Sequence, residues 1–172
     1  MDKFGFALLL VLAGAAPASA AELPARKAGL WEMKTTVTSG QVISMQQCVD
    51  AKSDEAMQAN SAANAQHDCS KRDVQKSGNT ITIDSVCTMA GKSRTAHTVI
   101  TGSFDSGYTM AVTSQAESAP ARTITIEAKW LGPCAADQKP GDMIMPNGTK
   151  MNVLEMQKGT GSPMAPATAP KQ

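Results

Sequence analysis

Segments of alternating apolar and polar residues recur through positions 31–130 of the chain, and turns divide this stretch into seven candidate strands. The clearest is 123–130, with the sequence TITIEAKW. Successive side chains of a β-strand point to opposite faces of a sheet, so this period-two pattern is typical of strands with one buried face. Short turns such as Gly78-Asn79 separate the segments, and sequential strands usually pair. We therefore predict a mainly β protein: a curved antiparallel β-meander or open barrel of about seven strands.

Residues 50–66 have a different composition. They are rich in Ala, Gln and Asn, and no β-branched residue follows Val49 in this stretch. Such a composition favours an α-helix, and Asp50 is well placed to cap its N-terminus. The helix has few apolar side chains to bury. We predict one short helix that lies across one end of the sheet with shallow burial.

The first twenty residues have the pattern of a secretory signal peptide. Lys3 precedes an apolar run over 4–16, and Ala18-Ser19-Ala20 has the small-x-small pattern that signal peptidase cleaves. Cleavage between Ala20 and Ala21 is expected. The apolar run is too short to span a bilayer comfortably and no second run follows it, so we predict an exported, soluble, periplasmic protein without a transmembrane segment.

The remaining chain divides into three parts. Residues 21–28 form a polar leader, and 29–157 form a single disulfide-bonded β domain of ordinary size. Within it, 142–157 surround a Pro146-Asn147-Gly148 turn and are expected to add a short strand pair or a helix. Residues 158–172 are rich in Pro, Gly and small polar residues. They bury too little apolar surface to fold, and we predict a disordered tail.

All four cysteines, Cys48, Cys69, Cys87 and Cys134, lie in the predicted domain. In an exported domain an even number indicates disulfides. The chain has no C-x-x-C motif and no neighbouring pair of histidines, which argues against zinc.

Four cysteines allow three pairings. We favour Cys48–Cys69 with Cys87–Cys134, because the first bridge would flank the predicted helix. The main rival joins Cys69 to Cys87 and Cys48 to Cys134. In its hairpin, however, a two-residue turn would place Ser70 rather than Cys69 opposite Cys87. The rival pairing stays open.

The charge and motif content point away from several functions. The net charge is +1 and aromatic residues make up 3% of the chain, so neither a basic patch nor a stacking platform for nucleic acid is expected. The two histidines, His67 and His97, belong to no recognisable catalytic motif. We predict no catalytic residue, no metal site and no cofactor.

Trp31 and Trp130 have two interpretations. A domain with so few aromatic residues needs them in its core, and we favour that role. Alternatively, they form the wall of a ligand site on the concave side of the curved sheet. A closed cavity lined by inward isoleucines would support ligand binding. Those isoleucines are Ile81, Ile83, Ile100 and Ile124.

Methionines gather near the C-terminal end of the domain, at Met143, Met145, Met151 and Met156. Thioether sulfur is a soft ligand that suits Cu(I), so copper handling is one alternative function. Methionine is also an ordinary filler of apolar gaps, and no His or Cys accompanies this group.

Three motifs together resemble a known family. Gly29-Leu30-Trp31-Glu32 opens the first strand, the four cysteines follow in order, and Leu131-Gly132-Pro133-Cys134 closes the unit. This combination resembles the domain-of-unknown-function 3617 (DUF3617) family, small exported proteins found mainly in proteobacteria, over residues 27–134. The chain departs from the pattern at Val49-Asp50-Ala51, where relatives often have Leu-Thr-Pro, and in its first hairpin, where relatives are often rich in Met and Pro.

The resemblance implies an envelope location and a disulfide-bonded β fold. It carries over no catalytic or binding residue, because the family has no assigned activity. From the sequence we therefore expect a non-enzymatic binding or interaction module, whose partner is a small apolar ligand or an envelope protein. The alternatives are copper handling and a hydrolase-like enzyme without a recognisable motif.

Overall fold

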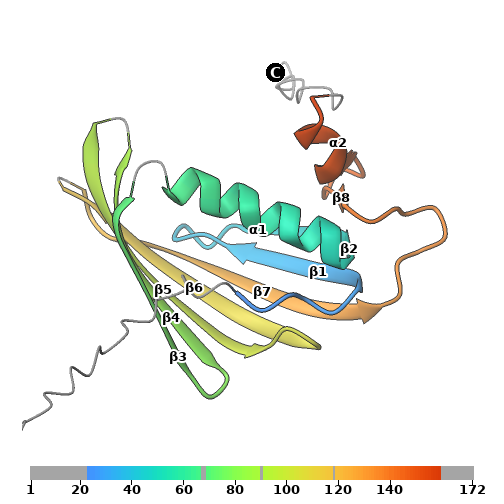
Figure 1. The fold of residues 1–172 in the computed structure, drawn as a ribbon, viewed down its shortest axis with the longest axis horizontal. Coiled ribbons are helices and arrows are strands. Elements are labelled where there is room, and N and C mark those ends of the chain that lie inside the picture. The colour runs from blue at the N-terminus through green and yellow to red at the C-terminus, as the bar shows by residue number, and fades with distance from the viewer. Residues whose placement is uncertain (1–22, 67–68, 90, 118, 160–172) are drawn as a thin grey trace, which may run out of the picture.

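The computed structural model describes residues 23–66, 69–89, 91–117 and 119–159 (Figure 1). The predicted signal peptide, its cleavage site and residues 160–172 of the predicted tail lie outside these ranges. The described elements are β1 (Gly29–Thr36), β2 (Val42–Val49), α1 (Ala51–Gln66), β3 (Cys69–Ser77), β4 (Thr80–Met89), β5 (Lys92–Ser103), β6 (Gly107–Ala116), β7 (Arg122–Gly132), β8 (Asp142–Ile144), β9 (Lys150–Asn152) and α2 (Val153–Gln157).

The strands form one antiparallel sheet with the order β3-β4-β5-β6-β7-β1-β2-β8-β9. The sheet is strongly curved but open, and α1 lies over one of its faces (Figure 1). The prediction of a mainly β protein with a curved antiparallel sheet is confirmed. Residues 142–157 add both a short strand pair, β8–β9, and the helix α2. No helix in the described ranges is both long and apolar enough to cross a membrane.

One crossover interrupts the meander. β3 to β7 pair in sequence, but β7 then pairs with β1, so the β1–β2 hairpin lies on the far side of β7 from β3. α1 connects the two parts. Its sixteen residues span about 24 Å along the helix axis, enough to carry the chain over the face of the curved sheet. As a result, β3 runs in the same direction as β2. It starts at the end of the sheet opposite to the one where β2 finishes.

The core lies between the sheet and the first turns of α1. Its buried residues are Trp31, Met33, Val49 and Ala128, which the strand register places on one face. Met57 of α1 packs against them. We call this side of the sheet the inner face and the opposite side the outer face.

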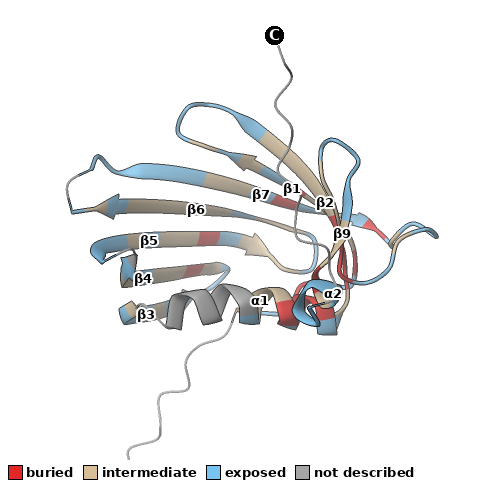
Figure 2. Ribbon diagram, turned by 90° about the horizontal axis from the view of Figure 1, so that it is seen from above, coloured by how far each residue is buried: buried red, intermediate tan, exposed pale blue. Residues whose placement is uncertain are grey.

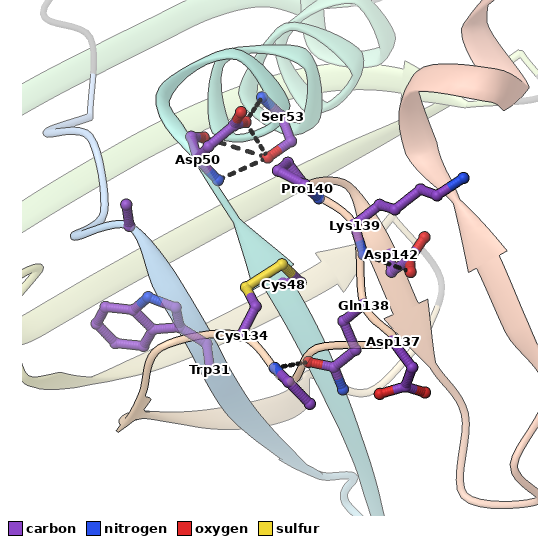
Figure 3. Close-up of a disulfide and its surroundings, with 12 residues drawn as sticks. Trp31, Cys48, Asp50, Ser53, Cys134, Asp137, Gln138, Lys139, Pro140 and Asp142 are labelled. Carbon is purple, nitrogen blue, oxygen red and sulfur yellow. Dashed lines mark hydrogen bonds between the residues drawn. A yellow bond between two sulfur atoms is a disulfide. The ribbon is translucent and has the colours of Figure 1, made fainter.

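The disulfides join Cys48 to Cys134 and Cys69 to Cys87. The predicted pairing of Cys48 with Cys69 was wrong, because α1 leaves these two residues at opposite ends of the sheet. β7 runs in the same direction as β2, since each is antiparallel to the β1 strand between them. Cys134, just after β7, therefore reaches Cys48 near the end of β2 (Figure 3).

The second bridge depends on a β-bulge. The predicted two-residue turn is present, because Ser77 pairs with Thr80 across Gly78-Asn79. That register alone would place Ser70 opposite Cys87. The register shifts between Cys69 and Lys71, so Ser70 is the extra residue and Cys69 pairs with Cys87.

Candidate ligand-binding face

The inner face has a packed end, built around Trp31, Met33, Tyr108 and Ala128. A polar network seals it. Arg26, in the segment before β1, is 9% exposed, and Asp54 of α1 is 1% exposed. The Asp54 carboxylate accepts hydrogen bonds from the Arg26 backbone N–H at 2.9 Å and from its Nε at 2.7 Å. Arg26 Nη1 also donates to Gln47 Oε1 on β2 at 2.8 Å. One arginine thus links the leader, the helix and the sheet.

The first turn of α1 is capped as the sequence predicted. The Ser53 N–H donates to the Asp50 carboxylate at 2.7 Å, and the Asp50 N–H donates to the Ser53 hydroxyl at 2.9 Å (Figure 3). The backbone N–H and hydroxyl of Ser53 hold the pKa of Asp50 below its usual value of 3.8. The cap therefore fixes the start of α1 beside the Arg26–Asp54 pair, while most apolar side chains under the helix belong to the sheet.

The aromatic side chains also gather at the packed end. Trp31 is fully buried, and its Nε1 donates to the Lys27 carbonyl at 2.8 Å. Trp130 pairs directly with Trp31 across β7 and β1, and the Lys27 ammonium lies 3.8 Å from its ring centroid. Burial raises the pKa of Tyr108. Trp31 thus packs in the core, and a role for the two tryptophans as a ligand wall stays a prediction.

The inner face continues into an apolar region that is less well covered. The register aligns Ile83, Val112 and Ile124 in one row across β4, β6 and β7, with Thr98 of β5 between Ile83 and Val112. Ile83 and Val112 are half-buried, and Ile124 is 38% exposed. Figure 2 shows buried residues at the start of α1 and none along β6, and the contacts of α1, such as Asp54 with Arg26, are at the packed end. We call the inner face around this row the open end.

The four isoleucines proposed to line a cavity share the inner face but differ in burial. Ile81 and Ile100 pair across β4 and β5, and they are 7% and 2% exposed. Ile83 and Ile124 lie one row further along, at the open end. Ile81, Ile83 and Ile100 are thus neighbours, whereas Thr98 and Val112 separate Ile124 from Ile83 in its row.

The outer face is mostly polar and carries a depression of about 350 Å³. Asp84, His97 and Thr113 lie in one row across β4, β5 and β6 at its rim. His97 Nδ1 is 2.7 Å from an Asp84 carboxylate oxygen, and both side chains are about half exposed. His67 lies outside the described residues.

The C-terminal methionines are spread over three elements. Met143 of β8 pairs with Met151 of β9, Met145 lies in the turn after β8, and Met156 of α2 is 50% exposed. Within the described ranges no three His, Cys, Asp or Glu side chains are grouped to hold a metal ion. No observation on the described residues favours the copper alternative.

A family model described as "Protein of unknown function (DUF3617)" matches residues 26–134. The chain belongs to the DUF3617 family. No curated protein and no solved structure matches it. The DUF3617 match begins at Arg26 and ends at Cys134, so it contains the packed end, the open end and both disulfides. β8, β9 and α2 follow the matched segment.

Neither Arg26 nor Asp54 was predicted to be important. Arg26 lies in the predicted polar leader and Asp54 in the predicted helix. One signal was available: the predicted helix has few apolar side chains, so its attachment to the sheet had to be partly polar. Nothing in the sequence identified which of its many charged residues would do this.

Proposed function

We propose that this DUF3617 protein is an exported, periplasmic, non-enzymatic binding module that holds a small apolar ligand on the open end of its inner face. The observation that carries this proposal is the row of Ile83, Val112 and Ile124, which stays partly exposed on central strands. Central strands normally bury their apolar face completely, and contiguous exposed apolar surface marks interaction sites.

The position of α1 favours a small ligand over a protein partner. α1 lies over the same face, held at its first turns by Arg26 and Asp54. A broad protein surface that covered the whole inner face would meet α1 at the packed end. A slender apolar molecule fits beside the helix and gains about 25 cal/mol for each Å² of apolar surface that is buried.

The remaining parts of the proposal have separate support. Two disulfides are typical of proteins that fold outside the reducing cytoplasm, and the predicted signal peptide agrees with this. The one His–carboxylate contact among the described residues, His97 with Asp84, lies on the outer face. The His97–Asp84 pair therefore lies on the opposite side of the sheet from the open end, which supports ligand binding without catalysis.

Binding is tested with a neutral fluorescent probe, N-phenyl-1-naphthylamine, titrated into the disulfide-intact protein. We expect Ile124→Glu to weaken probe binding at least tenfold, because a charge would have to be desolvated on the apolar row. Gln115→Glu is the matched control, since it adds the same charge on the outer face. We expect it to leave binding unchanged.

Two outcomes would overturn the proposal. One is no probe binding by the unmodified protein. The other is binding that Gln115→Glu weakens and Ile124→Glu leaves intact, which would move the site to the outer face. Export is tested separately by the intact mass of protein from the periplasmic fraction, where we expect a chain that starts at Ala21. A cytoplasmic chain that retains Met1 would contradict it.

A further inference from the structure

Three arginines lie at the outer edge of the open end. Arg72 of β3 and Arg122 of β7 lie in one row with Ser85, Ala96 and Ser114 between them. This row comes directly after the row of Ile83, Val112 and Ile124.

Arg94 of β5 lies one row further out, opposite Cys87 and Ala116. Arg72, Arg94 and Arg122 are all exposed. None of the three makes a hydrogen bond or ion pair with a side chain in the described ranges.

The strands contribute charge of one sign to this face. The inner-face positions of strands β1 to β7, as the register assigns them, include no Asp or Glu. The acidic residues of these strands are on the outer face. They are Glu32, Asp73, Asp84 and Glu127. An apolar surface that ends in cations and lacks acids is complementary to a molecule with an apolar body and an anionic end.

We propose that the ligand of the open end is a single-chain anionic amphiphile, a long-chain fatty acid. This inference rests on the proposed function. The acyl chain lies over Val112 and Ile124 toward Met110 and Ile126, and the carboxylate lies between Arg94 and Arg122. An arginine can donate two parallel hydrogen bonds to a carboxylate, which makes it the favoured cation for this group.

The dimensions of the sheet agree with this pose. β5 and β7 flank β6, so Arg94 and Arg122 project from strands about 10 Å apart. Between them the inner positions of β6 are Ser114 and Ala116, small residues that leave room for a head group. Arg122 and Ile126 are four residues apart on β7, which is about 13 Å along an extended strand. A strip two strands wide suits one acyl chain better than two.

The test compares two probes with the same chain, hexadecanoate and hexadecanol, below the concentration at which either aggregates. Each displaces N-phenyl-1-naphthylamine from the disulfide-intact protein. We expect hexadecanoate to bind at least tenfold more tightly than hexadecanol, and this preference to fall as salt is added, because exposed charges are screened. The double variant Arg94→Gln with Arg122→Gln should lose the preference and keep its affinity for hexadecanol.

The control variant is Lys71→Gln with Lys129→Gln, which removes two exposed outer-face cations and should retain the preference.

Equal binding of both probes would overturn the fatty-acid inference and leave the proposed function standing. Binding of neither probe would overturn both. Binding to vesicles of anionic phospholipid without binding of monomeric hexadecanoate would replace the fatty acid by a membrane surface and overturn the inference. A preference lost equally in the control variant would also contradict it.

Discussion

The packed end and the open end belong to the same face of the same sheet, yet they differ in how far other parts of the chain cover them. At the packed end, Trp31 and Met33 are covered by the first turns of α1 and by Arg26 of the leader. At the open end, Val112 and Ile124 continue the apolar pattern beyond that cover, and arginines follow them. The alternation of the strands is equally regular at both ends.

The difference shows that the alternation of residues along the strands sets which face of the sheet is apolar. The elements that pack on the sheet then determine how much of that face is buried. Here closure depends on a few long-range links: the Arg26–Asp54 pair and the Cys48–Cys134 bridge. Residues that make those links should control stability. Residues at the open end should control binding and contribute little to stability.

The largest effect is expected from the long-range disulfide of the packed end. Cys48 and Cys134 are 86 residues apart, and Cys69 and Cys87 are 18 apart. In the chain-entropy model, loops of these lengths contribute about 4.6 and about 3.2 kcal/mol. Cys48→Ala with Cys134→Ala should therefore lower the free energy of unfolding more than Cys69→Ala with Cys87→Ala. Urea denaturation measures both. The reverse order would show that the open end carries more of the stability than its contacts indicate.

The buried ion pair is the next strongest link. Asp54→Ala leaves the Arg26 guanidinium buried without its carboxylate, and removing one partner of such a pair costs about 3 kcal/mol or more. Glu55→Ala is the matched control, because Glu55 is the exposed neighbour of Asp54 on α1. We expect urea denaturation to give a change below about 0.5 kcal/mol for the control.

A double variant distinguishes the contribution of the charge pair from that of side-chain packing. Arg26→Met with Asp54→Leu removes both charges and keeps apolar volume, so it should recover most of the stability that Asp54→Ala loses. A double variant as unstable as Asp54→Ala would mean that the links to Gln47 and the backbone matter more than the charge pair itself.

Local sequence pattern was sufficient for the individual elements. Alternation and turn residues together predicted strands β1 to β7, the Ala- and Gln-rich stretch predicted α1, and Asp50 was recognised as its cap. Each of these depends on residues that are near one another in the chain. The three-residue strands β8 and β9 are too short for a period-two pattern to specify them as strands.

The links between elements could not be predicted in this way. The disulfide pairing depends on the direction of β3, which depends on where α1 ends in space. The bulge at Ser70 shifts the pairing by one residue and has no signature in composition. Arg26 and Asp54 are 28 residues apart, and many other charged pairs were equally compatible with the sequence. The open end could not be predicted either, because its exposure depends on where α1 lies.

A smaller effect is expected at the helix cap. Asp50→Ala should lower the free energy of unfolding by about 1 kcal/mol at neutral pH, whereas Asp50→Asn should retain most of it. Since Ser53 holds the pKa of Asp50 below 3.8 in the folded protein, the contribution is complete above the unfolded-state pKa. It is lost as the pH falls through the lower folded-state value. Urea titrations at several pH values should therefore show the difference in stability between the unmodified protein and the Asp50→Ala variant shrinking below about pH 4.

The smallest effect is expected at the open end, where it most directly tests the comparison. Ile124 and Ile100 have the same side chain on the same inner face, but Ile124 is 38% exposed and Ile100 is 2% exposed. Ile100→Ala removes buried methyl groups and leaves a cavity, at a cost of about 3 kcal/mol. Ile124→Ala removes groups that already contact water, so its cost should stay near 0.5 kcal/mol, measured by the same urea denaturation. Equal costs would mean that Ile124 is packed in solution. In that case the open end would be closed, and the ligand-binding surface proposed for it would not exist.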